Sequence, residues 1–245
     1  MMTKYGLIGK NISYSFSRGY FSEKFRRENI DAEYVNFDLQ EIKDLPKVLE
    51  QQQELRGLNV TIPYKEQILP FLDTLDEEAK EIGAVNTVRF LDNGKLKGYN
   101  TDHSGFSEAL KPFLKPHHKK ALVLGTGGAS KAILYALKKL KISATSVSRN
   151  PAEDQLSYDS LDKHILQEHT IIINCTPLGT FPNVADYPQV PVEYITSEHL
   201  VFDLIYNPPV TKLMELCRLQ GATVVNGQKM LELQAEKAWE IWSQK

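Results

Sequence analysis

The chain has 245 residues, of which 42% are hydrophobic and 24% charged, and its formal net charge is −2 at pH 7. This balance is that of an ordinary globular protein, and it disfavours both disorder and a broad nucleic-acid-binding surface. The chain is long enough for one large domain or for two modest ones.

Strand-like and helix-like segments alternate through the first part of the chain. The hydrophobic periodicity predicts strands at residues 5–9, 32–37 and 58–61, and helices at 18–28, 41–52 and 76–82. The Asn93-Gly94 step favours a hairpin turn between strands at 87–91 and 95–98. The alternation of strand, helix and strand predicts an α/β fold.

A second unit is expected to begin after Asp102. Strands are predicted at 121–124, 143–147, 170–173, 200–204 and 223–225, and helices at 129–140, 210–219 and 230–242. The near-continuous apolar runs ALVL and TIII favour a parallel sheet that is covered on both faces. Periodicity does not indicate where the last helix packs.

A glycine-rich turn joins the first strand of this second unit to its first helix. The turn contains Gly125, Gly127, Gly128 and Ala129. Glycines allow a close approach to a pyrophosphate, and the helix N-terminus offers backbone N–H groups to it. The spacing departs from G-x-G-x-x-G, and tight turns need glycine in any case. The flanking strand and helix nevertheless favour dinucleotide binding.

The end of the next strand bears on the choice of cofactor. An NAD site usually places an acidic residue there, which binds the ribose hydroxyls. This strand ends in Ser148 and Arg149, without an acid. Because an arginine suits the 2′-phosphate, the sequence favours NADP, although an exposed arginine at a strand end is also common.

Four polar segments precede the glycine-rich turn, each at or near a predicted strand end. They are SYSFS, NVTIPYK, GAVNT and GYNTD, and they contain Ser15 and Ser17, Thr61 and Lys65, Asn86, and Asp102. Together these residues offer hydroxyls, an amide, an ammonium and a carboxylate, which suit a small polyhydroxy acid. Taken singly, each is better explained as a helix cap, a turn residue or a surface lysine.

Nine segments in order resemble those of the shikimate dehydrogenase family, and they span nearly the whole chain. They are GLIGKNISYSFS, GLNVTIPYK, GAVNT, GYNTD, LGTGGAS, SRN, NCTPLG, DLIYNPPVT and NGQKMLELQA. The resemblance implies an N-terminal α/β substrate domain at residues 1–102 and an NADP-binding, Rossmann-type doubly wound domain at 103–228. It also implies that the last helix, about 229–245, packs back on the substrate domain.

The resemblance further implies an enzyme that uses NADPH to reduce 3-dehydroshikimate to shikimate, in chorismate and aromatic amino-acid biosynthesis. The matching positions imply a catalytic pair, a substrate-binding set and a cofactor-binding set. The pair is Lys65 and Asp102; the substrate set is Ser15, Ser17, Thr61, Asn86, Tyr206 and Gln234; the cofactor set is Gly125, Gly127, Gly128, Ala129, Ser148, Arg149, Asn174, Thr176 and Gly227.

Two departures from the family pattern bear on specificity. Tyr14 stands where the family commonly has histidine, beside the serines expected to bind the substrate carboxylate. Glu153 stands where a second basic residue would face the ribose phosphate, so NAD is possible as a cofactor. Three alternatives stay open: a relative that prefers quinate or NAD, a non-catalytic dinucleotide-binding relative, and an enzyme of unrelated substrate class.

The remaining expectations concern location, metals and partners. No stretch approaches the roughly 18 apolar residues of a membrane span, and the start lacks a secretory signal. Cys175 and Cys217 lie far apart in apolar contexts, which is typical of buried thiols in a reducing compartment. We therefore expect a cytoplasmic protein with a small-molecule substrate, no metal site, and no membrane or nucleic-acid partner, as a monomer or a homodimer.

Overall fold

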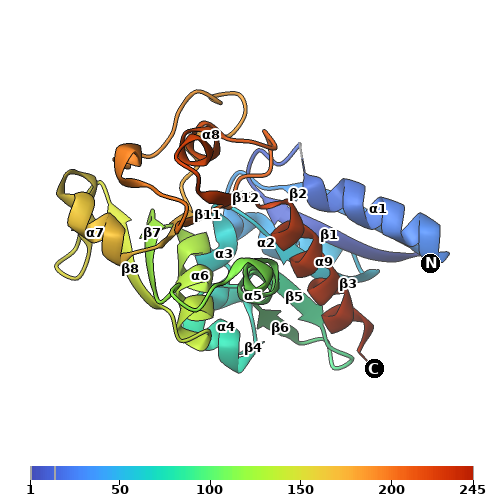
Figure 1. The fold of residues 1–245 in the computed structure, drawn as a ribbon. Coiled ribbons are helices and arrows are strands. Elements are labelled where there is room, and N and C mark those ends of the chain that lie inside the picture. Colours follow the sequence, from blue (N-terminus) through green and yellow to red (C-terminus); the bar gives the residue numbers. More distant parts are fainter. Residues whose placement is uncertain (1, 14, 245) are drawn as a thin grey trace. The chain divides into compact units, whose positions relative to one another are not determined.

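The computed structural model describes residues 2–13 and 15–244, and the chain divides into two compact units. Unit 1 comprises Met1–Thr101 together with Gln234–Lys245, and unit 2 comprises Asp102–Leu233. Each unit is built around its own six-stranded sheet (Figure 1). The predicted α/β fold class is confirmed.

The sheet of unit 1 mixes parallel and antiparallel strands in the order β2-β1-β3-β5-β6-β4. The bounds are β1 Thr3–Gly9, β2 Ala32–Asp38, β3 Leu55–Val60, β4 Thr74–Leu75, β5 Thr87–Phe90 and β6 Leu96–Tyr99. β1 is parallel to β2 and β3, whereas β5 is antiparallel to both β3 and β6. The carboxyl ends of β1, β3 and β6 therefore meet the start of β5 at one edge of the sheet.

Helices cover this sheet over two separate hydrophobic clusters. The bounds are α1 Phe16–Glu28, α2 Leu45–Gln51, α3 Tyr64–Gln67, α4 Glu77–Ile82 and α9 Gln228–Ser243, of which unit 1 includes the part from Gln234 onward. An aromatic cluster joins α1, β1, β2 and the end of α9 through Tyr5, Phe21, Phe25, Tyr34 and Trp242. The Trp242 indole donates to the Val88 carbonyl at 3.0 Å.

Close packing of α9 on the sheet requires a glycine in β3. A Cβ at Gly57 would lie 2.3 Å from Nε1 of Trp242, which is far inside van der Waals contact. The end of α9 is therefore held by the hydrogen bond of the Trp242 indole and by the close packing of that indole against Gly57.

The sheet of unit 2 is entirely parallel, in the order β12-β11-β10-β7-β8-β9. The bounds are β7 Lys120–Leu124, β8 Ser143–Ser148, β9 Leu156–Ser157, β10 Ile171–Asn174, β11 Leu200–Asp203 and β12 Thr223–Val225. Read from β9, this is the Rossmann strand order, with its topological switch point between β7 and β10. Ligands of such sheets bind at that point, beyond the carboxyl ends of the strands.

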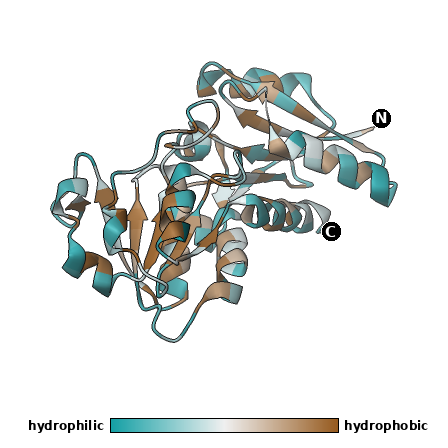
Figure 2. Ribbon diagram, turned by 45° about the horizontal axis from the view of Figure 1, so that its top comes forward, coloured by the Kyte–Doolittle hydropathy of each residue, from teal (hydrophilic) through white to brown (hydrophobic). Residues whose placement is uncertain are grey.

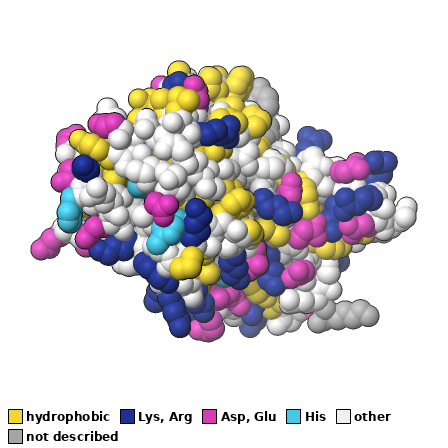
Figure 3. Space-filling view, in the orientation of Figure 1, with side chains coloured by type: hydrophobic (Ala, Val, Ile, Leu, Met, Phe, Trp, Pro, Cys, Tyr) yellow, Lys and Arg dark blue, Asp and Glu magenta, His cyan; other side chains and the backbone are white. Residues whose placement is uncertain are grey.

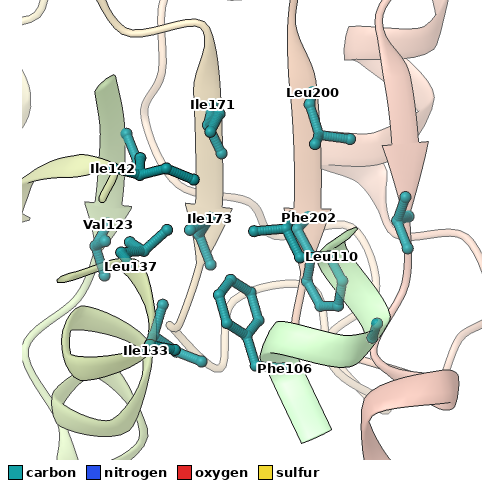
Figure 4. Close-up of a cluster of buried hydrophobic side chains, with 14 of the residues drawn as sticks. Phe106, Leu110, Val123, Ile133, Leu137, Ile142, Ile171, Ile173, Leu200 and Phe202 are labelled. Carbon is teal, nitrogen blue, oxygen red and sulfur yellow. The ribbon is translucent and has the colours of Figure 1, made fainter. Parts of the chain in front are cut away.

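Helices cover both faces of this parallel sheet, as its apolar strands require. Their bounds are α5 Asp102–Leu110, α6 Gly128–Lys139, α7 Lys163–Glu168 and α8 Lys212–Leu219. On one face α5 and α6 bury Phe106 and Ile133 against Ile173 and Phe202 (Figure 4). Leu166 of α7 and Leu213 of α8 belong to a second cluster, which includes Leu122 and Ile172 of the strands. Several strands of this sheet are coloured brown, for hydrophobic, in Figure 2.

The structure corrects several predicted boundaries and adds elements. The helix predicted at 41–52 is a 3₁₀ turn at Ile42–Asp44 followed by α2, with Pro46 in its first turn. The elements α3, β4, α5, β9 and α7 were not predicted from the sequence. Most of these are short, and α5 contains Gly105, so local propensity is weak and burial of Phe106 and Leu110 stabilises the helix instead.

Candidate functional site

The substrate-binding candidates Ser15, Ser17, Thr61 and Asn86 lie in segments at the end of the unit 1 sheet where β1 and β3 end and β5 begins. Ser15 and Ser17 follow β1, Thr61 follows β3, and Asn86 directly precedes β5. Thr61 donates its N–H to the Ile8 carbonyl at 2.9 Å, which holds its loop against β1.

The loops after β1 and β3 approach closely because Gly9 has no side chain. A Cβ there would lie 2.5 Å from a methyl group of Thr61 and 2.5 Å from a methyl group of Ile12. Ser15 caps α1 by accepting the Arg18 N–H at 3.2 Å, and Ser17 lies in the first turn. Tyr14 lies outside the described residues.

Lys65 lies in α3, tied by its backbone to the segment that contains Asn86. Its carbonyl accepts the Val85 N–H at 2.7 Å, and its side chain is partly exposed. The neighbouring Tyr64 hydroxyl donates to the Leu39 carbonyl at 2.6 Å. The short helix that carries the ammonium is thereby held on two sides.

Asn86, Thr101 and Gln234 form a buried polar cluster, although they come from three distant parts of the sequence. Asn86 Nδ2 donates to the Thr101 hydroxyl at 3.0 Å and to Gln234 Oε1 at 3.4 Å. The Thr101 N–H donates to Asn86 Oδ1 at 2.7 Å. α9 thus supplies a side chain to a cluster whose other members come from the loop before β5 and the end of β6.

Asp102 is the first residue of α5 and is 6% exposed. It follows Thr101 directly, at the point where the chain passes from unit 1 to unit 2. Its neighbour His103 packs edge-on against Tyr135 of α6, with ring centroids 5.1 Å apart.

In the glycine-rich turn of unit 2, the backbone packs closely on Thr176 at Gly125 and is open at Gly127. Gly125 has φ +96°, and a Cβ there would lie 3.0 Å from a methyl group of Thr176, so both its conformation and its packing favour glycine. Gly127 occupies the N-cap position of α6, so no side chain caps the helix, and a Cβ there would have no heavy atom within 4 Å. Gly128 and Ala129 begin α6 and are partly exposed.

The ends of β10 and β11 are joined by buried polar groups. Asn174 Nδ2 donates to Asp203 Oδ1 at 3.0 Å, and Asn174 Oδ1 accepts the Thr176 N–H and hydroxyl at 3.0 and 2.7 Å. Asp203 also accepts the Thr211 hydroxyl at 2.6 Å. Burial raises the pKa of Asp203, although these hydrogen bonds oppose the increase. The network fixes Thr176 beside Gly125.

Two further candidates, Tyr206 of the substrate set and Gly227 of the cofactor set, follow the carboxyl ends of β11 and β12. Gly227 donates its N–H to the Ile205 carbonyl at 3.0 Å, and a Cβ there would lie 2.0 Å from the Leu204 carbonyl oxygen. Tyr206 is partly exposed, and burial raises its pKa. No other residue type fits at Gly227 without a shift of the backbone.

Ser148 is the last residue of β8, and Arg149 and Glu153 follow it. Ser148 accepts the Asn150 N–H at 3.2 Å, which shapes the turn, while Arg149 and Glu153 are exposed. Burial raises the pKa of Tyr158, and the nearby Arg149 guanidinium opposes that increase. Arg149 and Glu153 therefore combine a cation and an acid in one exposed loop.

Some buried polar residues of the two units were given no role in the sequence analysis. Thr101 and Asn59 were visible only as parts of the GYNTD and NVTIPYK segments, and Tyr34 was one residue of an alternating strand. Asp203 gave a weak signal, an acidic residue at the end of an apolar strand. Their contacts span long sequence separations, which local patterns do not reveal.

The described surface and interior add three general findings. Basic and acidic side chains are interspersed over the face drawn in Figure 3. Among residues 2–13 and 15–244, no three histidine, cysteine or acidic side chains gather in a way that would hold a metal ion. Within the same ranges, no helix has the length and apolar character needed to cross a membrane.

Known proteins resemble this chain in both sequence and structure. Residues 7–88 match the family model described as the shikimate dehydrogenase substrate binding domain. A shikimate dehydrogenase (NADP(+)) of Clostridium botulinum is 39% identical over 248 residues, covering 97% of this chain and 95% of that protein.

Two solved structures extend the likeness to the fold. The shikimate 5-dehydrogenase of Thermus thermophilus, in complex with NADP(H) and shikimate, has a TM-score of 0.87 and 30% identity, covering 99% of this chain and 94% of that chain. The shikimate 5-dehydrogenase of Listeria monocytogenes, in complex with shikimate and NAD, has a TM-score of 0.86 and 29% identity, covering 100% and 92%. Since sequence similarity extends over nearly the whole of both units, the chain belongs to the shikimate dehydrogenase family.

Proposed function

We propose that this chain catalyses the NADP-dependent reduction of 3-dehydroshikimate to shikimate. The observation that carries the proposal is the polar edge of the unit 1 sheet, where Thr61, Lys65 and Asn86 come together, all three within the segment that matches the family's substrate-binding domain. The names of the similar proteins support the same substrate and cofactor.

The proposed substrate contacts follow the chemistry of the edge. Ser15 and Ser17 supply hydroxyl donors for a carboxylate at the start of α1. Thr61, Asn86 and Gln234 supply hydroxyl and amide groups for the ring hydroxyls, and the Tyr206 phenol is proposed as a further substrate contact. Buried amides bind such hydroxyls selectively, because an analogue that lacks one leaves an amide group of the site unpaired.

Lys65 and Asp102 are proposed as the catalytic pair. Reduction of a ketone builds negative charge on its oxygen, and the Lys65 ammonium would stabilise that charge and donate the proton. In the oxidation of shikimate, the neutral amine would accept the proton. The Asp102 carboxylate would orient the ammonium and a substrate hydroxyl by charge-assisted hydrogen bonds.

The residues of unit 2 fit a dinucleotide. The open space over Gly127 and the uncapped start of α6 suit a pyrophosphate, since backbone N–H groups are presented without a side chain in front of them. Arg149 would pair with the 2′-phosphate, and the turn of Asn174 and Thr176 with Gly227 would border the nicotinamide half. The bound dinucleotide supplies the hydride.

Steady-state assays of the purified protein test this proposal through the absorbance of reduced nicotinamide. We expect turnover of shikimate with NADP⁺. Lys65→Ala should lower kcat by about 10²–10⁴-fold with a much smaller change in KM, as expected for a lost proton donor. Lys47→Ala, which removes an exposed lysine that pairs with Asp44, is the matched control and should leave kcat unchanged.

The same assay separates the competing specificities. A larger kcat/KM with quinate than with shikimate, or with NAD⁺ than with NADP⁺, would contradict the proposed substrate or cofactor. Binding of NADP⁺ without turnover of either acid would indicate a non-catalytic relative. Retained turnover in the Lys65→Ala variant would overturn the role proposed for Lys65.

A further inference from the structure

Three buried side chains outside the proposed substrate contacts form a hydrogen-bonded chain behind Asn86. They are Tyr34 on β2, Asn59 on β3 and Thr87 on β5, with exposed fractions of 4%, 4% and 0%. The Tyr34 hydroxyl donates to Asn59 Oδ1 at 2.7 Å. Asn59 Nδ2 donates to the Asn86 carbonyl and to the Thr87 hydroxyl, both at 3.2 Å. The Thr87 hydroxyl donates to Asn86 Oδ1 at 3.1 Å.

The direction of each hydrogen bond follows from groups that have only one possible role. The backbone carbonyl of Asn86 can only accept, so Asn59 turns its Nδ2 toward it and its Oδ1 toward Tyr34. Tyr34 must then donate its proton to Asn59. Because the Thr87 oxygen accepts from Asn59 Nδ2, its own proton is available for Asn86 Oδ1 at 3.1 Å, which is nearer than the Thr101 hydroxyl at 3.4 Å.

The orientation of the Asn86 amide is also determined from its other side. The backbone N–H of Thr101 can only donate, and it lies 2.7 Å from Asn86 Oδ1. Asn86 Nδ2 therefore faces the Thr101 hydroxyl and Gln234, at 3.0 and 3.4 Å. Asn86 therefore presents a hydrogen-bond donor on the side of Gln234, the α9 residue that is proposed to contact the substrate.

We propose that Tyr34, Asn59 and Thr87 are positioning residues that hold the Asn86 amide with its Nδ2 on the side of Gln234, where a substrate oxygen would replace the long 3.4 Å contact to Gln234 Oε1. This inference rests on the proposed function for the placement of a substrate oxygen against Asn86. An amide already held in its binding orientation loses less conformational entropy when the ligand binds. The hydrogen-bonded chain of Tyr34, Asn59 and Thr87, called the relay below, therefore strengthens substrate binding. Loss of the Tyr34 hydroxyl removes the donor to a buried Asn59 oxygen and weakens the bonds that follow it.

A double-mutant cycle tests whether Tyr34 acts through Asn86. We expect Tyr34→Phe to raise KM for shikimate by about 3–10-fold, the size of one hydrogen bond, while kcat and KM for NADP⁺ stay within about two-fold. In an Asn86→Ala background, Tyr34→Phe should change KM no further, because its target is already gone. An equal increase in both backgrounds would overturn the proposal.

The same cycle also tests an alternative, in which Tyr34 acts on the substrate through Ser17 and not through Asn86. Burial raises the pKa of Tyr34 well above its ordinary value, and a hydrogen bond with Ser17 opposes that increase. If Tyr34 acted mainly through Ser17 on the substrate carboxylate, its effect would persist in the Asn86→Ala background. That result would also count against the relay.

Tyr5→Phe is the matched control, because Tyr5 is buried in the same aromatic cluster as Tyr34 and its hydroxyl is near Arg56. It should leave KM for shikimate within about two-fold. An increase as large as that of Tyr34→Phe would mean that altered packing causes the effect, and would refute the relay.

A measurement on the ligand-free protein tests the relay independently of the proposed function. If the wild-type protein turns over no shikimate, the proposed function fails. The relay is then tested by the exchange rate of the Asn86 side-chain amide protons, measured by NMR. Tyr34→Phe should accelerate that exchange relative to wild type and to Tyr5→Phe, and an unchanged rate would refute the relay.

Discussion

The ammonium of Lys24 on α1 lies 2.8 Å from the carboxylate of Glu236 on α9. The Lys24 side chain is only 7% exposed, and it also contacts Glu28 at 3.0 Å. The Tyr20 hydroxyl donates to the same Glu236 carboxylate. Since Gln234 lies on α9 two residues before Glu236, the ion pair anchors the helix segment that reaches the Asn86 cluster.

Breaking this ion pair from its two sides should have unequal effects. Glu236→Ala leaves a buried ammonium with one partner fewer, and we expect it to lower the free energy of unfolding by about 1–3 kcal/mol. Lys24→Met removes the buried charge itself and fills its space, so it should cost less. Glu23→Ala, at an exposed pair with Arg26, should leave stability almost unchanged. Urea denaturation measures all three, and a larger loss for Lys24→Met would contradict the argument.

Two buried histidines predict a loss of stability in mild acid. Burial lowers the pKa of His118 and of His199 below the ordinary value of about 6.5. In each, Nδ1 accepts a backbone N–H at 3.0 Å, from Lys115 and Thr196 respectively, and protonation would break that bond.

The sign of the pH effect follows from proton uptake on unfolding. Between the lowered native pKa and about 6.5 the unfolded chain binds more protons, so the free energy of unfolding falls as pH falls through that window. Denaturation at about pH 7.5 and about pH 5.5 checks this, with His118→Gln/His199→Gln expected to reduce the slope. If the free energy of unfolding depends on pH equally in that variant and in the wild type, other groups cause the loss of stability in acid.

Gly127 offers a test of cofactor binding that is separate from folding. Its φ is −77°, and a Cβ there meets no heavy atom within 4 Å, so Gly127→Ala should leave stability almost unchanged. The added methyl group would occupy the space proposed for the pyrophosphate, and we expect KM for NADP⁺ to rise by about 10-fold or more. Gly19→Ala, also without a heavy atom within 4 Å, is the control and should leave KM unchanged. Unaltered KM in both variants would place the pyrophosphate elsewhere.

Arg149 and Glu153 should have opposite effects on cofactor preference. Arg149→Ala is expected to lower kcat/KM for NADP⁺ by about 10–100-fold and to affect NAD⁺ far less, since only NADP⁺ carries the 2′-phosphate. Glu153→Gln removes an acid that repels this phosphate and should raise kcat/KM for NADP⁺ by about two- to five-fold. Glu193→Gln, at an exposed acid in another part of unit 2, is the control. Equal losses with both cofactors in Arg149→Ala would contradict the assigned contact.

The sequence alone determined the fold class and most of the regular elements of both sheets. The apolar runs at 121–124 and 170–173 correspond to β7 and β10, and the Asn93-Gly94 step correctly predicted the hairpin of β5 and β6. These features are local: a strand buried on both faces is apolar throughout, and a tight turn needs residues that tolerate positive φ, as Gly94 does at +77°. The chemical inventory of the polar segments was also readable without coordinates.

Only the tertiary structure decided which polar groups meet and which way their protons point. Tyr34, Asn59 and Asn86 come from separate strands and loops, yet their hydrogen bonds form one directed chain. In the same way, Asp203 acquires its raised pKa from burial beside Asn174, which lies on a neighbouring strand. Sequence periodicity encodes which face of an element is buried, whereas donor and acceptor roles depend on partners that only long-range packing brings within about 3 Å.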